Sequence, residues 1–279
     1  MRSAIILRGM ATTSFDTVTS WTPAPSPTEG VARFTLAGLP AEWMQGRGAF
    51  GGVVGAVGLR TMRTLVPAER TPRSVSVTFY GPVSAEPATL DARVVRAGRN
   101  VTFAEAEIVQ GGTPRARISA TFGADRESSV AHTAPTVELP DPDGFVRFAH
   151  IPNVTPQFVG MVDWRWTEGG FPFTGTEGST LASFLRFEIP AARGYERLVG
   201  LLDIMPAPVL QNLDRPAPAS SIQWTSHFVA PDTVPHGDYA WFRYETVAAG
   251  DGYSTTIGRL YDLEGRLLAW QEQLHAVFG

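Results

Sequence analysis

One acidic residue stands in one of the most apolar segments of the chain. Residues 197–210 read RLVGLLDIMPAPVL, with apolar side chains at steps of three and four that predict a buried helix face. Asp203 interrupts this run. Burial beside apolar groups raises the pKa of a carboxyl group and makes its ionised form a stronger base. The segment therefore points to a general base, and the competing interpretation is an acid at the rim of the core.

Two strand-like segments nearer the C-terminus carry polar residues in alternation. In SSIQWTSHF, residues 220–228, a period of two residues places on one face Ser221, Gln223, Thr225 and His227. In AWQEQLHAVF, residues 269–278, the same period places on one face Gln271, Gln273 and His275. These faces either line a site or are simply solvated.

Familiar catalytic and cofactor-binding motifs are missing from the sequence. It has no G-x-S-x-G nucleophile elbow, no phosphate-binding loop and no G-x-G-x-x-G after a strand. The five histidines are scattered rather than paired at metal spacing, and there is no cysteine. We therefore expect no metal and no cofactor, and chemistry that needs no covalent intermediate on the protein.

The chain repeats one pattern of strands. The segments 74–123 and 221–279 each read as three or four antiparallel strands separated by Gly, Pro and Asp turns, and each ends in Phe-Gly. Phe79-x-x-Pro82 in the first segment corresponds to Phe228-x-x-Pro231 in the second. The repeat predicts two structurally similar halves.

A helix candidate precedes each strand block, at 46–65 and at 197–210. The first candidate contains four closely spaced glycines, Gly51, Gly52, Gly55 and Gly58. Glycine inside a helix costs about 1 kcal/mol relative to alanine, so these glycines predict close packing of the helix against a sheet. One helix with a bent antiparallel sheet, present twice, is an α+β plan.

The predicted organisation is two repeats, 10–123 and 161–279, joined by a linker, 124–160. The first part of the linker is rich in Pro, Asp and Ser, which is typical of a segment that runs over the surface. Exposed edge strands of such sheets invite pairing between chains. We therefore expect a homo-oligomer.

Composition excludes several classes of partner. The net charge is −4, and no cluster of Lys or Arg provides a footprint for nucleic acid or for an anionic membrane. No segment approaches the roughly 18 apolar residues of a membrane helix, and the four-residue apolar run near the N-terminus is too short for a signal peptide. The absence of cysteine fits a reducing cytoplasm, where we expect the protein to act.

Four segments are similar to a known set of motifs. GAFGGVVGAVGL (48–59) is similar to F-G-G-Q-V-V-x-Q-A-L, and LLDIMPAPVL (201–210) to a helix in which an Asp precedes a Pro-containing segment. SSIQWTSHF (220–228) is similar to A-T-I-D-H-S-x-x-F, and YDLEGRLLAWQEQL (261–274) to Y-x-x-D-G-x-L-V-A-S-x-x-Q-E-G. Through these motifs the chain resembles the acyl-CoA thioesterase II family over nearly its whole length.

The resemblance implies a fold and a catalytic trio. The fold is a double hotdog, two tandem hotdog repeats, each with a bent antiparallel sheet wrapped around a central helix. The family's Asp, Thr and Gln together hold a water molecule, and they match Asp203, Ser221 and Gln271 in the second repeat. Serine in place of threonine keeps the hydroxyl group. Departures at Val53 and at Gln223-Trp224, where the family has Gln and Asp-His, leave the substrate class open.

The resemblance also implies contacts with an acyl-CoA substrate. Gly51 and Gly52 would let a thioester carbonyl approach the backbone closely. Trp224 and Phe228 are candidates to line an acyl tunnel, with plain core packing as the alternative. Because the first-half helix has no acid equivalent to Asp203, we expect one active site per chain.

Three functions are compatible with this sequence. The leading hypothesis is an acyl-CoA thioesterase that hydrolyses its substrate to free acid and CoA through a water molecule activated by Asp203. A non-catalytic acyl-thioester or lipid-binding protein of the same fold is the second. A hydratase or dehydratase is the third, and it would need a histidine beside Asp203, which the sequence does not place there.

Overall fold

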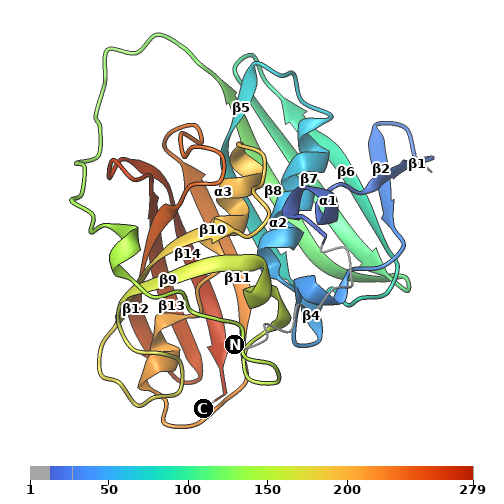
Figure 1. Cartoon of the computed structure of the whole chain (residues 1–279). Coiled ribbons are helices and arrows are strands. Elements are labelled where there is room, and N and C mark those ends of the chain that lie inside the picture. Colours follow the sequence, from blue (N-terminus) through green and yellow to red (C-terminus); the bar gives the residue numbers. More distant parts are fainter. Residues whose placement is uncertain (1–12, 27, 279) are drawn as a thin grey trace, which may run out of the picture.

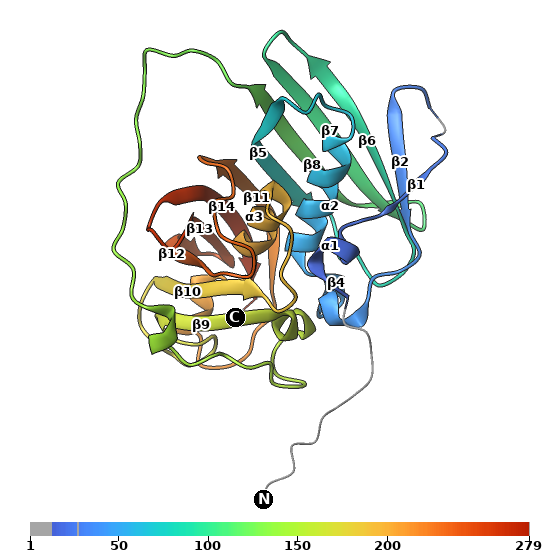
Figure 2. The ribbon, with the colours of Figure 1, turned by 45° about the horizontal axis from the view of Figure 1, so that its top comes forward.

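The computed structural model describes residues 13–26 and 28–278. The predicted start of the first repeat at residue 10 and the apolar run before it lie outside these residues. Antiparallel sheet is the main regular structure of the described chain, and the two longest helices lie side by side, each against its own half of that sheet (Figures 1 and 2).

The elements fall into two successive sets. The first set comprises α1 (Phe15–Val18), β1 (Thr22–Ala24), β2 (Val31–Leu36), β3 (Met44–Gln45), β4 (Gly48–Ala49), α2 (Gly51–Arg63), β5 (Arg70–Phe79), β6 (Ala88–Ala97), β7 (Val101–Gln110) and β8 (Thr113–Ala124). The second set comprises β9 (Val162–Glu168), β10 (Thr180–Phe187), α3 (Tyr195–Leu202), β11 (Ala219–Phe228), β12 (Ala240–Gly250), β13 (Tyr253–Tyr261) and β14 (Leu267–Val277). Short 3₁₀ turns lie at Ala41–Trp43, Pro142–Gly144, Gln157–Met161 and Pro208–Asn212.

One sheet of twelve strands runs through the described residues. Its order is β1-β2-β6-β7-β8-β5-β11-β14-β13-β12-β10-β9, with every neighbouring pair antiparallel. Within each set the strands follow the same order: β2-β6-β7-β8-β5 corresponds to β10-β12-β13-β14-β11. The repeat predicted from the sequence is therefore present in the strand order.

The two halves meet symmetrically at β5 and β11. Ser76 pairs with Thr225 in the middle of this contact, and their hydroxyl oxygens are 2.9 Å apart. On either side of it the registers are equivalent: Phe79 lies opposite Ala116 in the first half, and Phe228 lies opposite Ala269 in the second. Through this register the paired residues of β5, β6, β7 and β8 have counterparts in β11, β12, β13 and β14.

The glycines of α2 allow three close contacts. An added Cβ at Gly58 would lie 2.7 Å from Ile118 of β8, and one at Gly55 would lie 2.9 Å from Trp224 of β11. At Gly52 it would lie 3.0 Å from the Cα atom of Gly200 in α3. The predicted close packing is confirmed, and it involves the second helix as well as the sheet.

Helix α3 is shorter than the predicted segment 197–210. It ends at Leu202, and Asp203 is its C-terminal capping residue. Pro206 and Pro208 explain the early end, because a proline lacks the N–H that a helix needs and disfavours helical geometry in the residue before it. Asp203 therefore lies at the end of a helix and not inside one.

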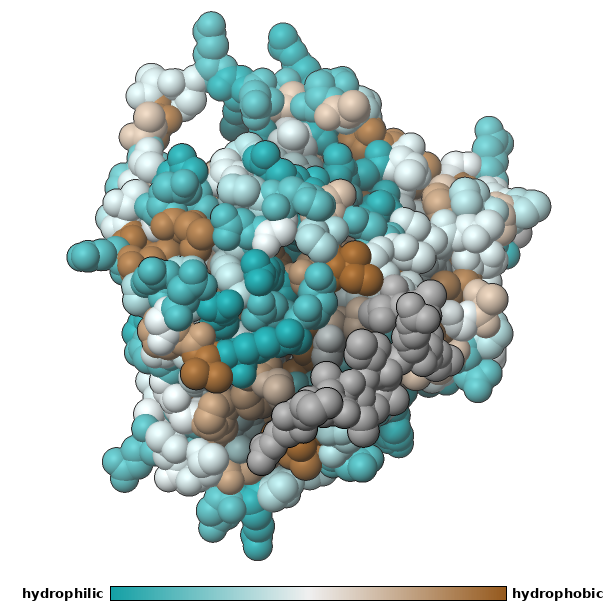
Figure 3. Space-filling model, in the orientation of Figure 1, coloured by the Kyte–Doolittle hydropathy of each residue, from teal (hydrophilic) through white to brown (hydrophobic). Residues whose placement is uncertain are grey.

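The segment between β8 and β9 crosses the outside of the molecule as a long connection (Figure 1). The exposed large hydrophobic side chains, among them Val130, Val146 and Val154, are scattered, and the face in Figure 3 shows hydrophobic groups only as separate spots. Among the described residues no helix is long and apolar enough to cross a membrane. The boundaries of the two repeats and the homo-oligomer stay predictions.

Candidate active site

Asp203, which caps the end of α3, lies against the start of α2. The Gly52 backbone faces the Asp203 carboxylate and lowers its pKa, and an added Cβ at Gly51 would lie 2.6 Å from Asp203 Oδ2. Phe50, the residue before α2, provides no side-chain cap for that helix. Since the first N–H groups of a helix lack intrahelical partners and carry partial positive charge, the Asp203 carboxylate occupies a favourable position for an anion.

The environment of Asp203 makes it a base near neutral pH. Burial raises the pKa of the Asp203 carboxyl group to about 7, because desolvation outweighs the hydrogen bonds from the Gly52 backbone and the Gln273 side chain, which both lower it. A carboxyl group with this pKa is partly ionised at pH 7 and can accept a proton from water.

Ser221 and Gln273 lie next to Asp203. The Gln273 amide donates from Nε2 to Ser221 Oγ at 2.5 Å and reaches Asp203 Oδ1 at 3.5 Å. The three side chains come from α3, β11 and β14, which are far apart in the sequence. The Asp203 carboxylate, the Ser221 hydroxyl and the Gln273 amide are therefore in mutual contact.

A β-bulge brings Ser221 to the inner face of the sheet. Ser221 lies opposite His275 and Trp224 lies opposite Gln273, so the strand contains one extra residue between these two pairs. The bulge places Ser221 on the same face as Trp224. The prediction that Ser221 shares a face with Gln223, Thr225 and His227 is therefore wrong.

Gln271 has a different partner from the one its assignment implies. Its Nε2 donates to the backbone oxygen of Leu202 at 2.9 Å and lies 3.5 Å from Gln273 Oε1. It thus holds the backbone just before Asp203, whereas Gln273 is the glutamine that contacts Asp203 and Ser221. The sequence contained the signal: in L-V-A-S-x-x-Q the Gln comes four residues after the Ala, and counting from Ala269 gives Gln273.

A pocket of about 570 Å³ reaches Asp203 and Ser221, and the buried Gln273 lies outside its lining. Its lining includes Gly51, Phe79, Asp203 and Ser221, with Arg47 from the β3–β4 hairpin. Trp224 and Phe228 are not among the lining residues: Trp224 is 1% exposed against Gly55, and the Phe228 ring packs edge-on against Tyr195 with centroids 5.0 Å apart. Gly52 likewise faces Phe50 and Gly200.

The first half carries no such polar group at the equivalent positions. The register places Pro72 where the second half has Ser221, and Ala120 where it has Gln273. At the opposite helix ends, Arg63 of α2 donates to both carboxylate oxygens of Glu196 in α3, at 2.8 and 2.9 Å. An ion pair therefore joins the end of α2 to the start of α3, at the other end of the helix pair from Asp203 and Gly51.

His275 lies behind Gln273 and not beside Asp203. The Tyr244 hydroxyl is 2.6 Å from Gln273 Oε1 and 3.3 Å from His275 Nε2. Burial lowers the pKa of His275 to about 4, so the ring is neutral at pH 7. Across the described ranges no hydrogen bond joins His275 to Asp203, and no group of three or more His, Asp or Glu side chains is arranged to hold a metal ion.

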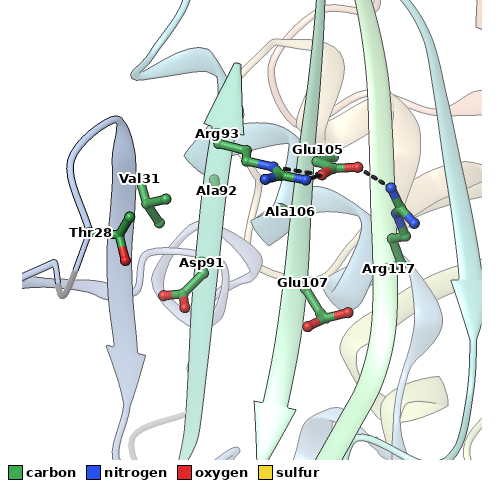
Figure 4. A pocket seen from close by; sticks show the side chains of 9 residues that line it. All are labelled: Thr28, Val31, Asp91, Ala92, Arg93, Glu105, Ala106, Glu107 and Arg117. Atoms are coloured by element: carbon green, nitrogen blue, oxygen red, sulfur yellow. Dashed lines mark hydrogen bonds and ion pairs between the residues drawn. The ribbon is translucent and has the colours of Figure 1, made fainter. Parts of the chain in front are cut away.

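A second hollow, of about 300 Å³, lies on the outer face of the first half (Figure 4). Its lining is strongly charged, but Arg93 and Arg117 both pair with Glu105, and Asp91 pairs with Arg33. These ion pairs are typical of a solvated sheet face. We assign no chemistry to this hollow.

The chain belongs to the acyl-CoA thioesterase family. Residues 39–123 match the family of acyl-CoA thioesterase N-terminal domains, and residues 132–277 match that of acyl-CoA thioesterase C-terminal domains. A comparison with curated protein sequences gave no match.

Several solved structures are similar to the chain in backbone over nearly its whole length, and one of them is described as having a hotdog fold. A protein of unknown function with a hotdog fold from Alicyclobacillus acidocaldarius has a TM-score of 0.81 at 23% identity, over 95% of this chain and 98% of that one. A proposed thioesterase II from Thermobifida fusca has a TM-score of 0.79 at 22% identity, over 97% of this chain and 99% of that one. An acyl-CoA thioesterase II from Mycobacterium marinum has a TM-score of 0.72 at 15% identity, over 95% of this chain and 99% of that one. At these identities the likeness establishes the hotdog fold alone.

Proposed function

We propose that this protein hydrolyses acyl-CoA thioesters to a free acid and CoA. The observation that carries the proposal is the meeting of Asp203, Ser221 and Gln273 beside the N-terminus of α2. Membership of the acyl-CoA thioesterase family supports the substrate class. The chain would be a double hotdog, with repeats at 10–123 and 161–279 and one site per chain.

The proposed reaction needs only water and these side chains. Gln273 holds Asp203 and Ser221 in place. Ser221 orients a water molecule, and Asp203 accepts a proton from it as the oxygen attacks the thioester carbonyl. The carbonyl oxygen gains negative charge at the positive end of α2, where Gly51 faces the pocket. The C–S bond then breaks, and the proton held by Asp203 passes to the CoA sulfur.

Gly51 and Gly52, both predicted as substrate contacts, have different surroundings in the structure. The Gly52 backbone lowers the pKa of the Asp203 carboxyl group, whereas Gly51 lines the pocket and is the residue that would face the substrate. The pocket lining makes Phe79 and Arg47 better candidates for substrate contacts than Trp224 and Phe228. Arg47 carries the positive charge that CoA phosphates require.

A panel of acyl-CoA substrates tests the proposal. The purified protein is incubated with straight-chain, branched and aromatic acyl-CoA, and free CoA is measured with a thiol reagent. Release of many CoA molecules per chain is the expected result. Saturable binding of acyl-CoA with no release would favour the non-catalytic acyl-thioester-binding alternative instead.

A further inference from the structure

A buried polar cluster lies directly behind Gln273. The Tyr244 hydroxyl, from β12, donates to Gln273 Oε1 at 2.6 Å. Thr256, from β13, donates from Oγ1 to the Tyr244 hydroxyl at 2.8 Å, and His275 Nε2 lies 3.3 Å from the same oxygen. Tyr244, Thr256 and His275 are all at most 5% exposed. None of the three is among the residues that line the pocket beside Asp203.

The donors and acceptors available fix the direction of each hydrogen bond in the series that runs from Thr256 through Tyr244 and Gln273 to Asp203. The ionised carboxylate of Asp203 accepts only, so the end of the Gln273 amide that faces it must be the NH₂ group. The amide oxygen of Gln273 then faces Tyr244 and accepts a hydrogen bond from the Tyr244 hydroxyl, which has only one proton to donate. The Tyr244 oxygen accepts from Thr256, and from His275 when the neutral ring is protonated at Nε2.

The first half shows that the fold does not need these polar side chains. The register aligns Tyr244 with Ala92, Thr256 with Ala104, and His275 with Phe122. All three counterparts are buried and apolar. A buried polar group is costly unless it is fully hydrogen-bonded, and here the cost falls only in the half that contains Asp203. The cluster therefore has a purpose tied to the site.

We propose that Tyr244, held by Thr256 and His275, is a positioning residue that fixes the Gln273 amide with its N–H groups toward Asp203 and Ser221. The inference rests on the proposed thioesterase function for its kinetic consequence. Without the hydroxyl, the amide oxygen keeps only the longer contact with Gln271 Nε2, at 3.5 Å. The amide then turns over more often and presents its oxygen to Asp203, where it would repel the carboxylate. The water would then be oriented less often, while the substrate pocket would be unchanged.

Tyr244→Phe tests this proposal by removing one oxygen. We expect kcat to fall about 10- to 100-fold, as a misplaced orienting group does, with KM within about twofold of the wild-type value. Tyr239→Phe is the matched control, because Tyr239 is a buried tyrosine of the same half whose hydroxyl donates to Asp163; it should keep wild-type kcat. In a Gln273→Ala background, Tyr244→Phe should change kcat by less than about twofold.

A second measurement does not depend on activity. The side-chain NH₂ signals of Gln273, assigned by their loss in Gln273→Ala, should exchange with water at least tenfold faster in Tyr244→Phe than in the wild type or Tyr239→Phe. Unchanged exchange, wild-type kcat, or a full kcat effect that persists without Gln273 would overturn the positioning role. If the wild type releases no CoA from any acyl-CoA, the proposed function fails, and the exchange rates alone decide the role of Tyr244.

Discussion

Asp203 at the end of α3 is in contact with Gly51 at the start of α2. An added Cβ at Gly51 would lie 2.6 Å from Asp203 Oδ2, closer than real side chains approach. The carboxylate belongs to the second half of the chain and the helix start to the first. The candidate site is therefore built between the two halves, although Asp203, Ser221 and Gln273 all come from the second.

This contact predicts that Gly51→Ala damages the site without unfolding the chain. The new methyl group would push the carboxylate away and also press on Phe79 at 3.2 Å. We expect kcat to fall about tenfold or more, because a displacement of about 1 Å at a reacting group has effects of this size. The same substitution at Gly144, where an added Cβ meets nothing within 4 Å, serves as control. Equal activity of the two variants would contradict the prediction.

The two neighbouring glutamines should differ in their effect on activity. Gln273 contacts Asp203 and Ser221, whereas Gln271 binds the Leu202 backbone. We expect Gln273→Ala to lower kcat about 100-fold, within the range seen for groups that act on the reacting proton, and Gln271→Ala to act mainly on stability. Steady-state kinetics and thermal unfolding of both variants separate these roles. A larger kcat loss at Gln271 would return the assignment to that residue.

The rate should depend on the ionisation of Asp203. Only the ionised carboxylate accepts a proton, and its pKa is about 7. We expect kcat/KM to rise with pH and reach half of its maximum near pH 7. A profile that is flat between pH 6 and 8, or that falls with pH, would show that Asp203 is not the base.

The same pKa predicts a stability effect with a definite sign. The folded-state pKa of about 7 lies above the ordinary value of 3.8, so between these pH values the unfolded chain releases this proton first. The wild type therefore loses stability as pH rises from 4 to 7, by up to about 4 kcal/mol. Asp203→Asn should unfold at a higher denaturant concentration than the wild type at pH 8, and the difference should shrink toward pH 4.

The sequence predicted the repeat and Asp203, because both leave a local signal. Phe79 and Phe228 mark equivalent strands, and an acid in an apolar helical pattern is conspicuous in any single stretch. The contact of Asp203 with Gly51 left no such signal, since it depends on how two helices cross. The sequence predicts Gly51 as a substrate contact, which the pocket lining keeps open, but not its contact with Asp203.

Two features escaped prediction for physical reasons. A strict period of two residues misplaces Ser221, because a bulge adds one residue to β11 and reverses the face. Tyr244 lies in YAWFRYETV, where a buried aromatic residue reads as ordinary strand core until its hydroxyl is seen on Gln273. Such hydrogen bonds join strands that are distant in sequence, so alternation alone does not reveal them.

The central claim is that Asp203 activates water to cleave an acyl-CoA thioester. The most direct test compares CoA release by the wild type, Asp203→Asn and Asp214→Asn, on the acyl-CoA that the wild type cleaves fastest. Asp214 is exposed and outside the pocket lining, so its variant controls for the change of charge. The account predicts that Asp203→Asn lowers kcat at least about 100-fold while Asp214→Asn keeps it. Full activity of a folded Asp203→Asn protein would contradict the account.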